Sequence, residues 1–304
     1  MKTRAPTLRQ LAVVALIVAT TASVGFGRAS AETAEEPPEH IPDVVFARMV
    51  ENPVSGITRV PLANATQFGI PPNKRVSNAL VLAPIIPALF KNGWSIITRT
   101  TIPVVVTVPF ATDATGVPTP TGRTTGFGEI STEWLGHKML RGKKDQFYDI
   151  ALGPFAGFPS ASDDFLGTGR WRLGPELVLA LSAREWVTIL AARNVWSVGQ
   201  DRGRADVNRL CLEYFLFYNL PKLFYLLYET TVTSNWEAAR GNQWTVPIGL
   251  GFGRHHRLPK RPRLALTTRI SGLYNAVRTD TDGNWQLIAT LVFWKPNPAV
   301  FDID

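Results

Sequence analysis

Residues 171–181 read WRLGPELVLAL, and large apolar side chains alternate there with charged or small ones. Trp171, Leu173 and Leu177 fall on the odd positions, whereas Arg172 and Glu176 fall on the even positions. Because successive side chains of a β-strand point to opposite faces, this stretch predicts a strand with one apolar face and one polar or small face. The same period of two recurs in residues 94–108, 207–219 and 243–253.

Alternation interrupted by polar turns continues along the chain and predicts twelve strands. Their expected ranges are 56–70, 74–90, 94–108, 126–136, 146–158, 170–182, 185–199, 207–219, 223–236, 242–254, 263–276 and 284–294. The connections alternate between tight or basic turns, such as 137–144 and 255–263, and polar loops that are mostly acidic or glycine-rich. An up-and-down antiparallel sheet puts successive connections at opposite ends, so two alternating kinds of connection indicate that topology.

The charges on the polar faces decide between two all-β architectures. A soluble β-sandwich buries its apolar faces together and leaves the charges on a solvated outer face, whereas a transmembrane barrel turns the apolar faces to lipid and lines its lumen with the polar set. A wet lumen tolerates charges that a dry core does not. We predict the up-and-down transmembrane barrel, with Asp149 and Arg263 among its inward charges. The candidate pore-lining residues are Arg99, Glu129, Glu133, Arg172, Glu176, Arg209, Glu213, Glu229 and Arg269.

All nine tryptophans lie close to an expected strand end. One rim receives Trp94, Trp134, Trp186 and Trp294, and the other receives Trp171, Trp196, Trp236, Trp244 and Trp285. Indole rings prefer the membrane–water interface, and outer-membrane barrels carry aromatic girdles at both rims. A sandwich would more often hold tryptophan in mid-strand, so the placement favours a barrel with an aromatic girdle.

Residues 1–31 have the parts of a secretory signal. Lys2, Arg4 and Arg9 precede an apolar run at residues 11–24, and residues 29–31 (ASA) fit a cleavage site. The run is shorter than the ~20 residues of a spanning helix, which favours cleavage over an uncleaved anchor. We expect a signal peptide at 1–31, a disordered periplasmic leader at 32–52, the barrel at 53–295 and a C-terminal tail at 296–304.

The formal net charge of +8 over 304 residues does not require a nucleic-acid partner. Residues 1–31 contain four basic residues and no acidic one, so half of the excess belongs to the export segment. The rest is divided between basic turns and a mixed-charge interior. An exported barrel of this kind is expected in the bacterial outer membrane, with lipid as its surroundings and no nucleic-acid partner.

Few side chains are available for covalent or metal chemistry. Cys211 is the only cysteine, which excludes an intrachain disulfide, and four histidines leave little material for a metal centre. His137, His255 and His256 fall in expected turns of one rim, away from the acidic loops, so we expect no hydrolase triad. We predict neither a metal, a cofactor nor an enzymatic activity.

Residues 210–228, LCLEYFLFYNLPKLFYLLY, admit a second interpretation as a helical hairpin. Glu213, Asn219, Pro221 and Lys222 interrupt the apolar run, and its aromatic period-two character favours two strands around a turn.

An ordered series of short motifs resembles a family of Gram-negative outer-membrane proteins named for the meta-pathway of phenol degradation. The series comprises residues 52–55 (NPVS), 67–69 (QFG), 97–100 (ITRT), 102–103 (IP), 126–129 (GFGE), 162–164 (SDD), 166–171 (LGTGRW), 174–175 (GP), 194–197 (NVWS), 219–221 (NLP), 235–238 (NWEA), 244–247 (WTVP), 274–275 (YN) and 285–286 (WQ). The resemblance covers roughly residues 51–294. It implies an outer-membrane β-barrel and the passage of small, hydrophobic or aromatic compounds, and it supplies no catalytic residues.

The expected function is therefore a passive channel or transporter for a small solute, with selectivity set by lumen charges. Two other functions remain open: a structural or receptor-like barrel with a plugged lumen, and a soluble periplasmic β-sandwich binding protein. The sequence names neither the solute nor an oligomeric state.

Overall fold

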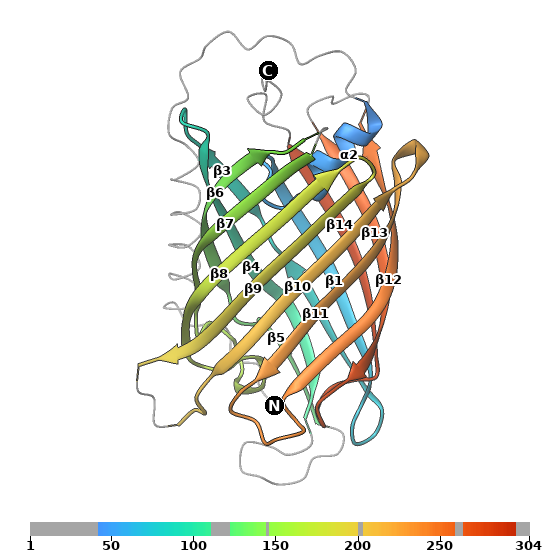
Figure 1. Ribbon diagram of the computed structural model, residues 1–304. Coiled ribbons are helices and arrows are strands. Elements are labelled where there is room, and N and C mark those ends of the chain that lie inside the picture. Colours follow the sequence, from blue (N-terminus) through green and yellow to red (C-terminus); the bar gives the residue numbers. More distant parts are fainter. Residues whose placement is uncertain (1–41, 111–121, 144–145, 200–202, 259–263, 296–304) are drawn as a thin grey trace.

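The computed structural model describes residues 42–110, 122–143, 146–199, 203–258 and 264–295. Its wall consists of antiparallel strands that tilt around a common axis (Figure 1). The strands are β1 Thr58–Ile70, β2 Arg75–Leu82, β3 Ile85–Leu89, β4 Trp94–Pro109, β5 Arg123–Gly126, β6 Ser131–Arg141, β7 Gln146–Gly157, β8 Trp171–Ala183, β9 Trp186–Val198, β10 Asn208–Asn219, β11 Phe224–Asn235, β12 Trp244–Arg257, β13 Ala265–Val277 and β14 Trp285–Lys295. A helix, α2 (Asp43–Glu51), precedes them.

The sheet closes on itself. β1 pairs with β14 in an antiparallel register that runs from Thr58 opposite Lys295 to Phe68 opposite Trp285. β2 and β3 share one position between β1 and β4, and β5 and β6 share the next, so the wall is a closed barrel of twelve strands. The prediction of an up-and-down barrel is confirmed, and closure excludes the two-sheet sandwich.

Alternation places apolar side chains outside and polar or small ones inside. In β8, Leu173 is 46% exposed on the outer face, whereas Glu176 is fully buried on the inner face. The same two faces recur in β11, β12 and β13, where Leu226, Leu250 and Ile270 are exposed outside. An apolar outer band around a closed barrel is the surface that lipid solvates.

Breaks in the wall occur at prolines. Pro84 separates β2 from β3, and Pro103 borders a register shift between β4 and β2. A second shift lies between Val246 and Pro247 in β12. Proline lacks the amide that a ladder needs, so the chain bulges or ends a strand there.

Two expected turns are partly strand. β6 extends to Arg141 and includes His137, and β12 extends to Arg257 and includes His255 and His256. The basic composition of both stretches predicts turns, and this prediction is wrong for the parts that lie in β6 and β12. His137 and His255 face the interior and are buried, so their polarity reflects the lumen and not a solvated turn.

The expected disordered leader is wrong for residues 43–51, which form α2. The helix begins after Pro42, whose fixed φ suits a helix start. It ends before Asn52, which adopts an extended backbone because it precedes Pro53. Phe46, Ala47 and Val50 form its buried face. In Figure 1, α2 lies at the upper end of the barrel, where β8 and β9 meet in a short turn.

Among the described residues, no helix is long and apolar enough to cross a membrane. The predicted signal peptide, the first part of the leader, Arg263 and the C-terminal tail fall outside the described residues.

Candidate functional site

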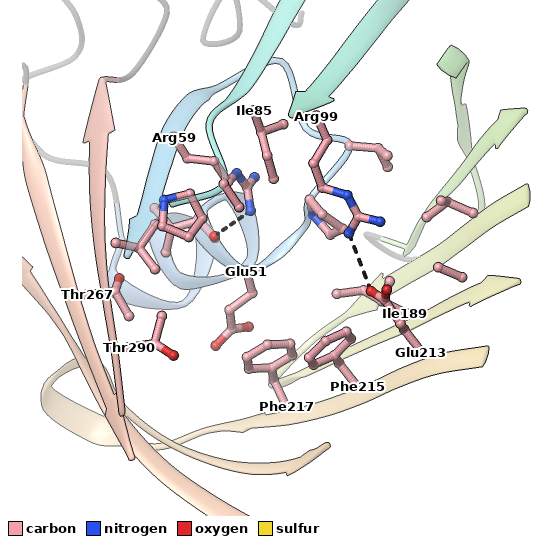
Figure 2. A pocket seen from close by; sticks show the side chains of 18 of the residues that line it. Glu51, Arg59, Ile85, Arg99, Ile189, Glu213, Phe215, Phe217, Thr267 and Thr290 are labelled. Carbon is pink, nitrogen blue, oxygen red and sulfur yellow. Dashed lines mark hydrogen bonds and ion pairs between the residues drawn. The ribbon is translucent and has the colours of Figure 1, made fainter. Parts of the chain in front are cut away.

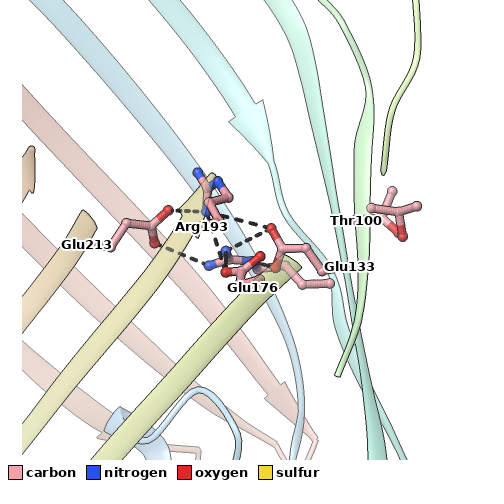
Figure 3. A network of polar contacts seen from close by, with 7 residues as sticks. Thr100, Glu133, Glu176, Arg193 and Glu213 are labelled. Carbon is pink, nitrogen blue, oxygen red and sulfur yellow. Dashed lines mark hydrogen bonds and ion pairs between the residues drawn. The ribbon is translucent and has the colours of Figure 1, made fainter. Parts of the chain in front are cut away.

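Five lumen-facing charges form a central charge cluster, one from each of β4, β6, β8, β9 and β10: Arg99, Glu133, Glu176, Arg193 and Glu213 (Figure 3). Arg99 lies 2.6 Å from Glu133, 3.1 Å from Glu176 and 3.3 Å from Glu213. Arg193 lies 2.8 Å from Glu213 and 3.5 Å from Glu176. Two guanidiniums thus hold three carboxylates across the middle of the lumen.

The sequence predicted four members of this cluster and missed Arg193. Alternation along β9 also assigns Arg193 to the inner face. Position 193 has the same parity as four residues that are buried there: Val187, Ile189, Ala191 and Val195. The Arg99 and Arg193 side chains keep 23% and 19% of their surface exposed inside the barrel.

The other predicted lumen charges lie apart from the cluster. Glu129 pairs with Arg172 at 2.9 Å and accepts hydrogen bonds from the Thr168 hydroxyl and the Gly169 amide, which fixes the loop between β7 and β8. Arg269 lies 3.5 Å from Glu229. Arg209 is exposed near the start of β10. Asp149, also expected inside, is buried.

Residues 43–55, here called the plug, fill the lumen at the end opposite the long loops. Phe46 and Val50 of α2 pack in an apolar group with Ile57, Leu223, Ala265 and Trp294. Val54 joins the main apolar group of the inner wall. The plug is therefore seated on buried apolar surface, and polar contacts add to this at both sides.

One side of the plug is held by a chain of hydrogen bonds. The Asn52 amide donates to Asp149 Oδ2 at 2.7 Å, and Asp149 Oδ1 lies 2.8 Å from His137 Nε2. His137 Nδ1 lies 2.7 Å from the Ser95 hydroxyl. Ser95, His137 and Asp149 come from β4, β6 and β7, so this chain joins three wall strands to the plug.

The other side repeats the same order of groups. Glu51 Oε1 lies 3.2 Å from His255 Nε2, and His255 Nδ1 lies 2.7 Å from the Thr267 hydroxyl. The Asn219 amide donates to Glu51 Oε2 at 2.9 Å. Each chain runs from hydroxyl to imidazole to carboxylate to carboxamide. The plug supplies the carboxylate of one chain, Glu51, and the carboxamide of the other, Asn52.

The hydroxyl–imidazole–carboxylate order resembles that of a hydrolase triad, but its setting differs. Such catalysis needs free backbone donors aimed at an oxyanion. Ser95 lies within β4, paired with Leu89 of β3 and His137 of β6, where amides serve the ladder. The chain of Ser95, His137 and Asp149 therefore suits a role in fixing the plug.

Arg59 of β1 binds the end of the plug helix. Its Nη1 donates to the Val50 carbonyl at 3.2 Å, and its Nη2 donates to the Asn52 carbonyl and to Ser55. Its guanidinium lies 4.5 Å from the Trp294 ring centre. A cation at the carbonyl end of a helix is favoured by the helix dipole, so Arg59 stabilises the seated helix.

A cavity of about 230 Å³ separates the plug from the central charge cluster. We call it the chamber. Figure 2 shows Glu51 and Arg59 on one side of it, Arg99 and Glu213 on another, and Phe215 and Phe217 along the wall. Ile97, Leu135, Val292 and Trp294 complete a mainly apolar lining.

Burial raises the pKa of Glu51, and its hydrogen bond to His255 opposes that rise. Across the described ranges, no group of three or more histidine, cysteine, aspartate or glutamate side chains is placed to hold a metal ion.

Eight of the nine tryptophans lie exposed. Trp94 and Trp186 begin strands at the plug end, Trp134 lies inside β6, and the exposed members at the opposite end are Trp171, Trp196, Trp236, Trp244 and Trp285. Trp294 was wrongly assigned to the girdle. It is 3% exposed and donates to Thr267 at 2.9 Å, because even positions of β14 face inward.

A closed barrel with an apolar exterior and a charged lumen defines an outer-membrane β-barrel protein. No protein-family model and no curated protein matches the chain. The COG4313 outer membrane channel from Pseudomonas putida F1 is similar, with a TM-score of 0.58 and 12% identity over 86% of this chain and 100% of that chain. The NanC porin has a TM-score of 0.47 and 14% identity over 79% and 100% of the two chains. The first likeness shows the fold. The closed barrel with its apolar exterior is the architecture of the bacterial outer membrane.

Proposed function

We propose that this protein is a channel for small solutes and that the plug closes one end of it. Short turns of outer-membrane barrels face the periplasm, which assigns the plug to the periplasmic mouth. The resemblance in the ordered motifs supports membership of the meta-pathway family, and with it passage of small hydrophobic or aromatic compounds.

The central charge cluster is the observation that carries this proposal. Ion pairs removed from water contribute little to stability. Apolar side chains of similar volume often stabilise a fold as much as such pairs do, or more. Arg99 and Arg193 also keep part of their surface exposed inside the barrel. A wet lumen in which charges meet a passing solute explains these residues better than a purely structural role does.

A structural or receptor-like barrel with a plugged lumen is the second candidate. The seated plug and the fully buried Glu176 favour it. The two candidates differ in what happens when the plug leaves: a channel then passes solute, whereas a filled scaffold does not.

Liposome swelling distinguishes them. Liposomes that contain the folded double variant Glu51→Ala/Asn52→Ala, in which the plug is released, should admit small neutral and charged solutes and exclude larger ones. The full chain should admit the small solutes more slowly, and liposomes with heat-unfolded protein serve as the control. The gel mobility of unboiled samples verifies folding. If both the full chain and a variant with a released plug leave the liposomes impermeable to every solute, the channel proposal is wrong.

A further inference from the structure

The chamber combines an apolar lining with a guanidinium whose hydrogen-bonding capacity is mostly unused. Phe215, Phe217, Ile97 and Val292 supply apolar surface, and Arg269 reaches the chamber from β13. A dry cavity of about 150 Å³ lined by apolar side chains can hold benzene. The chamber is larger, at about 230 Å³, and its lining includes three arginines, Arg59, Arg99 and Arg269, and three glutamates, Glu51, Glu133 and Glu213.

Arg269 is less closely paired than the two arginines of the central charge cluster, Arg99 and Arg193. Its nearest carboxylate oxygen, Glu229 Oε2, lies at 3.5 Å, and its hydrogen bond to Thr290 is also 3.5 Å long. In the central charge cluster, Arg99 has three contacts between 2.6 and 3.1 Å. Both contacts of Arg269 use Nη2, and its buried Nε has no hydrogen-bond partner among the described residues.

The partner of Arg269 is also incompletely satisfied. Glu229 Oε1 is buried without a hydrogen bond in the part of the chain that the structure describes. Since buried polar groups are almost always paired, an unpaired donor beside a cavity with a mainly apolar lining indicates a place for a ligand oxygen. Glu229 holds one nitrogen of Arg269, which leaves Nη1 available.

We propose that the chamber binds a small organic anion, with its carboxylate on Arg269 and its apolar body against Phe215 and Phe217. The other charged side chains of the chamber have partners of their own. Arg99 is engaged by Glu133 and Glu213, and Arg59 by the end of α2. Glu51 is held by His255 and Asn219. The inference rests on the proposed channel function and names the class of solute that the lumen holds.

Three probes of matched chemistry test the site in purified, folded protein. Benzoate has the ring and the carboxylate, benzyl alcohol has the ring without the charge, and acetate has the charge without the ring. Calorimetric titration should show benzoate binding at least about tenfold tighter than either other probe, the ratio expected for one charge-assisted hydrogen-bonded contact.

The variant Arg269→Gln tests whether Arg269 causes the preference for benzoate. It should bring benzoate to within about threefold of benzyl alcohol, and Arg209→Gln, which removes an exposed arginine outside the chamber, should leave the tenfold preference in place. Equal binding of benzoate and benzyl alcohol to the unmodified protein overturns the proposal even if Arg269→Gln does not fold. An unchanged preference in folded Arg269→Gln also overturns it.

Binding is measured here without flux, so the two proposals fail separately. Liposomes that admit solutes while benzoate shows no preference refute only the anion site. Benzoate binding by a barrel that admits nothing refutes only the channel.

Discussion

Glu51 of the plug lies 3.2 Å from Nε2 of His255, a residue 204 positions away in the wall strand β12. The two side chains are almost completely buried, and Tyr225 stacks on the imidazole with ring centres 4.7 Å apart. A carboxylate at this depth is stable only with partners, and His255 and Asn219 supply them. The contact between Glu51 and His255 therefore anchors the plug to the wall strand β12.

Removing this carboxylate should loosen the plug. Glu51→Ala leaves His255 and Asn219 without their partner, and breaking such a buried pair weakens docking by about 3 kcal/mol. Hydrogen exchange of residues 43–55 should become faster, whereas Arg278→Gln, which changes an exposed side chain in the loop after β13 at the opposite end of the barrel, should change it little. Equal exchange in the two variants would show that Glu51 does not hold the plug.

Docking of the plug should weaken as pH rises. Burial raises the pKa of Glu51 in the docked plug, so docking favours the protonated carboxyl. This contribution is complete below the pKa of the undocked side chain and is lost as pH rises through the higher docked pKa. A spin label attached at Val44→Cys, in a protein that also carries Cys211→Ser, should become more mobile as the pH rises through the docked pKa of Glu51.

The matched variant Glu51→Gln removes the titration while keeping the side-chain shape. The label should then respond to pH much less. An identical pH profile in both proteins would assign the titration to other groups near the plug.

Removing a negative or a positive charge from the central charge cluster should shift the ion preference in opposite directions. Glu213→Gln removes a negative charge and should shift the reversal potential under a salt gradient toward anion preference, whereas Arg99→Gln should shift it toward cation preference. Arg141→Gln, at the exposed end of β6, provides a control outside the lumen cluster. Shifts of the same sign in both cluster variants would count against a selectivity role.

Gly253 makes room for Tyr225. A methyl group at this position would lie 2.2 Å from the tyrosine ring, whereas one at Gly272 meets nothing within 4 Å. Gly253→Ala should lower the free energy of unfolding by about 1–3 kcal/mol, the usual cost of overpacking. Gly272→Ala should be near neutral. Urea unfolding followed by gel mobility measures both, and equal stability of the two variants would contradict the close approach.

Much of the barrel could be predicted because alternation in a strand is a local property. The parity of residues 171–181 places Arg172 and Glu176 inside without knowledge of any other strand. Trp294 shows how this rule was misapplied: proximity to a strand end suggested a girdle, whereas parity within β14 turns the ring inward and Phe293 outward.

The plug could not be recognised in the same way. Nine residues are too few for a stable isolated helix, so α2 depends on contacts with strands far away in the sequence. Local signals existed in Pro42, in the spacing of Phe46 and Val50, and in Asn52-Pro53. The acidic, proline-rich residues before them suggested disorder, and only the fold brings Asp149 and His255 to the plug.

Single-channel recording in planar bilayers tests the plugged channel most directly. The full chain should give small or brief conductance steps, and the double variant Glu51→Ala/Asn52→Ala, which breaks both hydrogen-bond chains to the plug, should give larger and longer ones. Arg278→Gln, in the loop after β13, should behave like the unmodified protein. Folded protein that gives no steps in either the full chain or the double variant would contradict the proposed channel.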